Sequence, residues 1–91
     1  MSSVRQKFVI INQLGLHARA AAAFVKVANR YKSTITVKKD SIAVNCKSIM
    51  GVLMLAAPKG TSLQIEAVGE DAAAAVHELG ELIRQKFGEP A

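Results

Sequence analysis

The sequence predicts an α+β domain with the element order β-α-β-β-α-β-α, in which helices cover one face of a four-stranded sheet. Two observations lead to this class. Four short segments alternate apolar and polar residues, as half-buried strands do. Three further segments have helical character, through alanine content, a capping residue or apolar residues at a spacing of three or four. Because the only tight turn joins two consecutive strands, the sheet should be antiparallel or mixed, with its other face solvated.

The first half of the chain accounts for three strands and one helix. Residues 4–11 alternate and are rich in β-forming residues. Residues 18–31 are rich in alanine and contain neither glycine nor proline, which favours a helix. Residues 35–38 and 42–44 alternate on either side of an Asp-Ser turn at 40–41, so we expect a β-hairpin there.

The second half accounts for two helices and the last strand. Ser48 suits the N-cap of a short apolar helix over residues 49–55. Residues 63–67 alternate as a half-buried strand. Residues 71–86 form the clearest amphipathic helix, although Gly80 inside it costs about 1 kcal/mol relative to alanine.

The length and composition limit where chemistry can take place. With 91 residues the chain fits one domain and not two, so we expect a single domain over residues 1–91. With 51% hydrophobic and 21% charged residues, the composition is that of a globular protein. A chain this small must pack nearly all its elements into one core. It leaves no room for an internal active-site cavity, so any site should lie on the surface.

The charge balance indicates an acidic partner. Twelve Lys and Arg against seven Asp and Glu give a net charge of +5. The basic residues are scattered, aromatic residues make up only 4% and tryptophan is absent, so we expect no nucleic-acid partner. The longest mostly apolar run, residues 49–58, is too short to cross a bilayer, so we expect no membrane insertion.

The cysteine and histidine content excludes several kinds of site. The single Cys46 allows no internal disulfide and no cysteine-based metal site, and we expect it to be a half-buried apolar residue. His17 and His77 lie 60 residues apart and give no metal-ligand spacing, so no metal and no cofactor is expected. No signal peptide is visible, which predicts a cytoplasmic protein.

The most informative segment is Leu-Gly-Leu-His-Ala-Arg at residues 14–19. His17 falls where a loop meets the start of a helix, whose unpaired amides and partial positive charge attract anions. Arg19 in the first turn is unfavourable with the helix dipole unless an anion binds there. Together the imidazole, the Ala18 and Arg19 amides and the guanidinium suit a phosphoryl group, with the imidazole as nucleophile. Local physics leaves a second interpretation open, a surface histidine that flanks a helix beside a solvated arginine.

Two motifs in this chain resemble those of a known family. Residues 15–21, Gly-Leu-His-Ala-Arg-Ala-Ala, are similar to the pattern G-[LIM]-H-[AT]-R-P-A, and residues 47–53, Lys-Ser-Ile-Met-Gly-Val-Leu, are similar to a regulatory-serine segment. Their spacing matches as well, as does Ala-Pro-Lys-Gly at 57–60. The chain thus resembles, over essentially its whole length, the histidine-containing phosphocarrier protein (HPr) family of the bacterial sugar phosphotransferase system and its nitrogen-branch relatives.

The resemblance implies a fold and a role. The fold is an open-faced β-sandwich, a four-stranded antiparallel sheet covered on one face by three helices. His17 would accept a phosphoryl group on its ring Nδ1 from the phosphohistidine of enzyme I, itself charged by phosphoenolpyruvate, and donate it to a histidine of a IIA domain. Arg19 would be the assisting cation. Such a carrier turns over nothing by itself, so it is a component of a phosphoryl relay and not a self-sufficient enzyme, and the family implies a monomer.

The chain departs from the family pattern at Ala20, where the family usually has proline. Proline fits the first helical turn, so alanine predicts a somewhat looser helix start. The identity of the partner system, sugar or nitrogen branch, therefore stays open. Asn12 either hydrogen-bonds the backbone of the site loop, as the matching family position does, or forms a hydrogen bond only within its own turn.

Ser48 has two interpretations. As a plain N-cap it contributes about 1 kcal/mol to stability, which alone explains a serine there. The resemblance makes it the target of HPr kinase/phosphorylase. A phosphate at a helix N-terminus is tolerated by the fold, but its charge would repel an acidic partner.

The short helix after Ser48 is too apolar to bury every side chain. Ile49, Met50 and Leu53 are therefore expected to form an exposed docking patch near His17, where the family docks enzyme I and IIA domains. Lys26 and Lys47 would add positive charge at its rim. For Met50 the alternative is that it fills the core.

Two other functions compete with the phosphoryl carrier. The first is an HPr-like regulatory module, of nitrogen-branch or catabolite-control type, that acts by phosphorylation-dependent protein binding and not in sugar uptake. The second is a small basic nucleic-acid binder with a ferredoxin-like core. The dispersed charge, the few aromatic residues and the third helix argue against the second.

Overall fold

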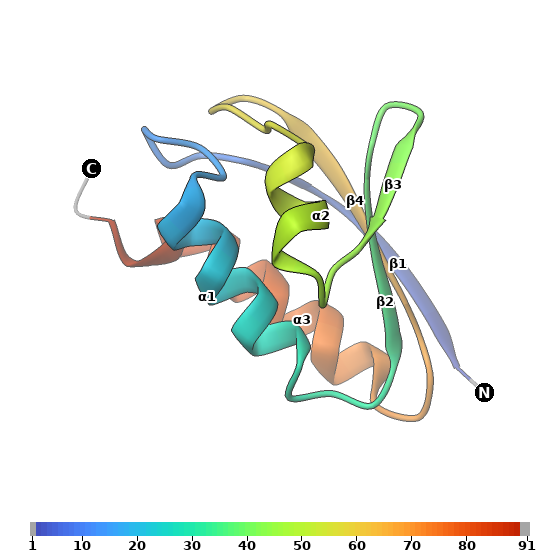
Figure 1. The fold of residues 1–91 in the computed structure, drawn as a ribbon. Helices are drawn as coiled ribbons and strands as arrows, with labels where there is room; N and C mark the ends of the chain where they lie inside the picture. The colour runs from blue at the N-terminus through green and yellow to red at the C-terminus, as the bar shows by residue number, and fades with distance from the viewer. Residues whose placement is uncertain (1, 90–91) are drawn as a thin grey trace.

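The computed structural model describes residues 2–89 and has the predicted element order (Figure 1). Its elements are β1 (Ser3–Val9), α1 (Ala18–Ala28), β2 (Thr34–Lys39), β3 (Ile42–Asn45), α2 (Ile49–Met54), β4 (Ser62–Val68), α3 (Ala72–Arg84) and the short 3₁₀ turn η1 (Lys86–Gly88). The α+β class is confirmed. Within residues 2–89 no helix is long and apolar enough to cross a membrane.

The four strands form one sheet in the order β1-β4-β2-β3, and every neighbouring pair is antiparallel. The sequence left a mixed sheet open, and the pairing settles it as antiparallel. The three helices lie on one face of the sheet (Figure 1). The other face carries polar side chains, such as the row in which Gln64 pairs with Lys7 on one side and Lys38 on the other. This is the open-faced β-sandwich that the resemblance implied.

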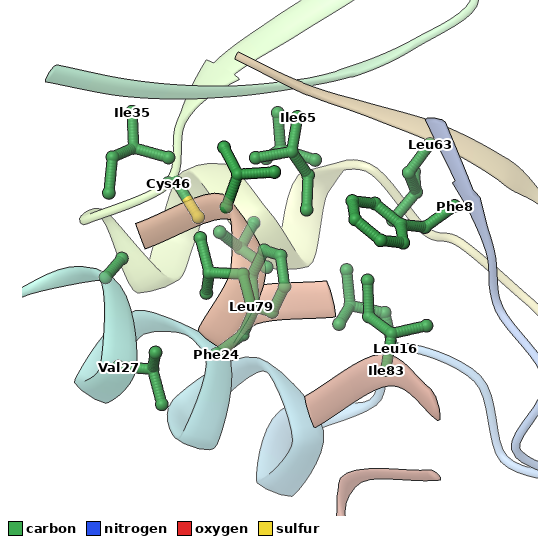
Figure 2. Close-up of a cluster of buried hydrophobic side chains, with 14 of the residues drawn as sticks. Phe8, Leu16, Phe24, Val27, Ile35, Cys46, Leu63, Ile65, Leu79 and Ile83 are labelled. Atoms are coloured by element: carbon green, nitrogen blue, oxygen red, sulfur yellow. The ribbon is translucent and has the colours of Figure 1, made fainter. Parts of the chain in front are cut away.

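The core lies between the sheet and the helices (Figure 2). Phe24 from α1 and Leu79 from α3 are fully buried there, together with Ile65 from β4. Cys46 is also fully buried, and not half-buried as predicted, because it follows β3 directly and bonds the Ile35 carbonyl through its amide. Burial raises the pKa of its thiol to about 12, so it stays protonated and unreactive.

Close packing explains the glycine inside α3. A Cβ atom on Gly80 would lie 2.5 Å from the Phe8 ring, too close for any real contact. Gly80 therefore lets α3 approach β1, and the burial of Phe8 offsets the helix-propensity cost.

Both long helices end earlier than the sequence predicts. The helix predicted over 18–31 ends at Ala28, because the Asn29 side chain donates to the Val25 carbonyl and closes the last turn. The helix predicted over 71–86 ends at Arg84, because Lys86 and Phe87 take positive φ values. The Phe87 ring then packs edge to face against Phe24, with 6.2 Å between the ring centroids. This reversal brings Glu89 next to His17 at the start of α1.

Asp71, just before α3, provides a pH-dependent contact. Its carboxylate accepts hydrogen bonds from the Lys32 amide at 2.8 Å and from the amide and hydroxyl of Ser33. The Ser33 hydroxyl first, then the backbone amides, hold the pKa of Asp71 below its ordinary value of 3.8. Because this folded pKa is lowered, the stabilisation is present above the unfolded value and is lost as the pH falls through the folded one.

Asp71→Asn should therefore lower the free energy of unfolding at neutral pH, and the difference from the wild type should disappear in strong acid. Urea unfolding at neutral pH and again below the usual carboxyl pKa measures both. Glu70→Gln is the matched control, since Glu70 is exposed next to Asp71 and should have little effect. A difference that is constant with pH would show that the charge of Asp71 is not what stabilises this turn.

Candidate functional site

The loop between β1 and α1 positions His17. Gly15 takes φ +69°, and a Cβ there would lie 2.6 Å from the Ala57 carbonyl oxygen and 2.8 Å from Pro58 Cα. The Leu16 amide donates to that same Ala57 carbonyl at 2.8 Å, and the Leu16 side chain is buried in the core. Only glycine fits this close approach, which holds the loop and leaves the next residue on the surface.

Asn12 braces the loop from inside. Its side chain is fully buried, and its Nδ2 donates to the Gly15 carbonyl at 2.7 Å and to Glu89 Oε2 at 2.6 Å. The predicted bond to the loop backbone is thus confirmed. The Asn12 side chain also joins this loop to the C-terminal segment, which the sequence did not predict.

His17 is the N-cap residue of α1 through its backbone, with φ −75° and ψ 179°. Its carbonyl accepts the first helical hydrogen bond, from Ala21 at 2.8 Å, whereas its side chain caps nothing. The imidazole is 27% exposed, and its Nε2 lies 2.6 Å from Glu89 Oε2. Within residues 2–89 no hydrogen bond engages the other ring nitrogen, Nδ1.

Beside the imidazole is a hollow of about 110 Å³. Its lining residues are His17, Arg19, Ala20, Phe87, Gly88 and Glu89. Arg19 is exposed, and in the part of the chain that the structure describes it makes no ion pair. The first-turn amides of α1, those of Ala18 and Arg19 included, have no partner within the helix. The predicted imidazole and guanidinium thus line one hollow at the start of α1.

Ser48 is the N-cap of α2, and its Oγ accepts a hydrogen bond from the Gly51 amide at 3.2 Å. The capping interpretation is therefore confirmed. The helix that it begins contacts α1, and the segment after that helix, residues 56–58, lies with His17 around a shared shallow hollow. Ser48 thus begins the helix whose other end leads to residues 56–58 beside His17.

The exposed side chains of α2 form an apolar patch, which we define as Ile49, Met50 and Met54. They are 40%, 67% and 74% exposed, so the alternative that Met50 fills the core is wrong. Leu53, predicted to belong to this patch, is instead half-buried against the core. Met54 was missed because a six-residue helix has no clear apolar face from which its orientation follows.

The two predicted rim lysines differ in their surroundings. Lys26 is exposed on α1. Lys47 donates through its Nζ to the Tyr31 carbonyl at 2.6 Å, so its ammonium group is held by the segment that follows α1. Whether either lysine contacts a partner stays a prediction.

A histidine and an arginine that line one hollow, on an open-faced sandwich, match what the resemblance to the class of small phosphoryl-carrier proteins implies. A family model described as the PTS HPr component phosphorylation site matches residues 4–85. The chain is 49% identical over 86 residues to the phosphocarrier protein HPr of Neisseria meningitidis serogroup A, covering 94% of this chain and 97% of that one. It is 50% identical over 84 residues to the HPr of Pseudomonas aeruginosa, covering 91% and 93%.

The comparison with solved structures indicates the same family. An HPr structure from Thermoanaerobacter tengcongensis superimposes with a TM-score of 0.91 at 43% identity and covers 100% of both chains. The chain therefore belongs to the HPr family and is a phosphocarrier of the phosphotransferase system. Of the regulatory-module alternatives, the catabolite-control type is not favoured over the phosphocarrier.

Proposed function

We propose that His17 is the phosphoryl acceptor of this carrier and that Nδ1 is the attacking atom. The observation that carries the proposal is the placement of His17 and Arg19 on one hollow at the start of α1. The Nδ1 lone pair attacks the phosphorus of a donor phosphohistidine, and the donor's P–N bond breaks with its electron pair returning to the donor ring. Arg19 and the amides of Ala18 and Arg19 hold the phosphoryl oxygens.

The family interacts with enzymes of the phosphotransferase system. We propose that enzyme I is the donor and a IIA domain the acceptor, both docking on the apolar patch with Leu53, Lys26 and Lys47 at its border. The net charge of +5 supports acidic partner faces. The proposed place of this relay is the cytoplasm. Another HPr structure from Thermoanaerobacter tengcongensis is described as a dimer, so the expected monomer stays a prediction for this chain.

The test is to incubate the protein with enzyme I, Mg²⁺ and phosphoenolpyruvate, and then with a IIA domain. We expect one acid-labile phosphoryl group on the peptide that contains His17, and its loss from that peptide when the IIA domain is added. Labelling on His77, or a label that the IIA domain does not remove, would contradict the proposal.

Arg19→Ala should slow phosphoryl transfer more than it weakens docking. Losing a donor to the moving phosphoryl group costs about 2–3 kcal/mol in the transition state, by analogy with an oxyanion-hole donor, which is a roughly 30- to 150-fold lower rate. Stopped-flow transfer from phosphorylated enzyme I gives the rate, and calorimetry gives the affinity. Arg5→Ala is the control, because Arg5 pairs with Glu66 on the open face of the sheet. If Arg19→Ala transfers the phosphoryl group at the wild-type rate, Arg19 takes no part in transfer and is only a solvated residue near His17.

We further propose that Ser48 is a regulatory phosphorylation site for HPr kinase/phosphorylase. Its position supports this, because the hydroxyl lies at the first turn of the helix that carries the apolar patch. A phosphate there would lie at a helix N-terminus, which the fold tolerates, and next to the surface that a partner must desolvate.

A further inference from the structure

The segment after α3 has an unusual backbone. Lys86, Phe87 and Gly88 take φ values of +57°, +54° and +82°, and two of these residues are not glycine. Side chains rarely adopt this left-handed conformation, so the surrounding structure must hold it. Packing of Phe87 against Phe24 does so, together with hydrogen bonds from the Gly88 amide to the Gln85 carbonyl and from the Glu89 amide to the Lys86 carbonyl.

The reversal brings Glu89 to the site loop. Its Oε2 lies 2.6 Å from His17 Nε2 and accepts from Asn12 Nδ2 at 2.6 Å, while its Oε1 accepts weakly from the Leu14 amide at 3.5 Å. The Glu89 side chain is only 14% exposed. Burial acts to raise the pKa of Glu89, but the hydrogen bonds that it accepts, that of His17 foremost, outweigh burial and keep the pKa below its usual range. Glu89 is therefore a carboxylate at neutral pH.

A carboxylate only accepts hydrogen bonds, so the atom of His17 that faces it must carry a proton. Nε2 is that atom. The neutral imidazole has one proton, and placing it on Nε2 leaves the lone pair on Nδ1. The contact with Glu89 thus selects the tautomer that has a nucleophilic Nδ1, and it fixes the rotation of the ring.

We propose that Glu89 is a positioning residue for phosphoryl transfer, which holds His17 as the Nε2-protonated tautomer and balances the charge that the ring gains. This rests on the proposed function, with His17 as the acceptor. When Nδ1 gives its electron pair to phosphorus, positive charge develops on the ring, 2.6 Å from the carboxylate. Arg19 acts instead on the phosphoryl oxygens. Nearby carboxylates orient and stabilise histidines in this way in other sites.

Two substitutions separate the effect of Glu89 on the His17 tautomer from the effect of its negative charge. Glu89→Ala removes both the hydrogen-bond acceptor and the charge. Glu89→Gln keeps an oxygen, and the donors decide where it points: Asn12 Nδ2 at 2.6 Å is a much stronger partner than the Leu14 amide at 3.5 Å. The glutamine oxygen should therefore turn toward Asn12 and His17, which preserves the tautomer but not the charge. Glu70→Ala and Glu70→Gln are matched controls, because Glu70 is exposed in the turn between β4 and α3.

The experiment combines ¹⁵N NMR of His17 in the free protein with transfer kinetics from phosphorylated enzyme I. We expect the wild type and Glu89→Gln to show a protonated Nε2 and a bare Nδ1, and Glu89→Ala to show a mixture of tautomers. The kcat for transfer should fall about 10- to 100-fold in Glu89→Ala and by less in Glu89→Gln, with a smaller change in KM. The Glu70 variants should match the wild type in both measurements.

Two results would overturn this role of Glu89. One is a wild-type rate in Glu89→Ala. The other is a lower rate with the tautomer unchanged, which would mean that Glu89 only anchors the chain end. In both cases His17 is still phosphorylated, so the proposed function stands. A wild-type protein that is never phosphorylated on His17 would instead remove the proposed function itself.

Discussion

His17→Ala should fold like the wild type and accept no phosphoryl group at all. The imidazole supplies the only nucleophile in the proposed step, and alanine has no substitute for Nδ1. The fold should survive, because the imidazole is partly exposed and belongs to the surface loop and not to the core cluster. Labelling from phosphoenolpyruvate through enzyme I measures the first effect, and thermal unfolding the second.

His77→Ala is the matched control for this experiment. His77 is exposed on α3, and its removal changes neither the loop nor the hollow beside Arg19. Its labelling should equal that of the wild type. Labelling that persists in His17→Ala, or that disappears in His77→Ala, would refute the assignment of His17.

Ser48→Asp should lower the rate of His17 phosphorylation by about tenfold or more, while the melting temperature stays equal or rises slightly. Aspartate is as good an N-cap as serine, and its charge suits the positive end of the helix dipole. No acidic residue now occupies the first turn of α2. At the docking surface the same charge lies beside Ile49 and Met50, and repulsion from an acidic partner face amounts to several kcal/mol.

Ser48→Asp should thus keep or raise stability and lower the rate of phosphoryl transfer. Measuring both on one variant tests whether Ser48 lies at a helix N-terminus and also beside the docking surface. Ser48→Ala should give the reverse pattern, with about 1 kcal/mol less stability and normal transfer, because the bond to the Gly51 amide is lost and no charge is added. If Ser48→Asp binds enzyme I and accepts phosphate as fast as the wild type, Ser48 lies outside the docking surface. The regulatory proposal would then be withdrawn and only the cap would remain.

Features that depend on residues close together in the sequence were predictable. The alternation over residues 63–67 identifies β4 (Ser62–Val68), because sheet side chains repeat every two residues. Ser48 was predictable as a cap, since its partner amide is three residues away. His17 and Arg19 share one helix start, so their proximity follows from their spacing. The resemblance added the role of that pair, which local physics left open.

Features that depend on distant contacts were not predictable. Glu89 lies 72 residues after His17, and it reaches the ring only because Lys86 and Phe87 leave the helical conformation. Their local propensities favour continuing α3, and the packing of Phe87 on Phe24 overrides them. Gly80 also looked costly, because nothing in the sequence shows that the Phe8 ring needs its space.

The central claim, that His17 carries the phosphoryl group on Nδ1 while Nε2 faces Glu89, is tested most directly by NMR of the phosphorylated protein. Coupling between ³¹P and the ring nitrogens of ¹⁵N-labelled histidine identifies the atom that is bonded to phosphorus. We predict a phosphorus bonded to Nδ1 of His17 and a proton on Nε2. A phosphoryl group that enzyme I places on Nε2, or on any residue other than His17, would contradict this account.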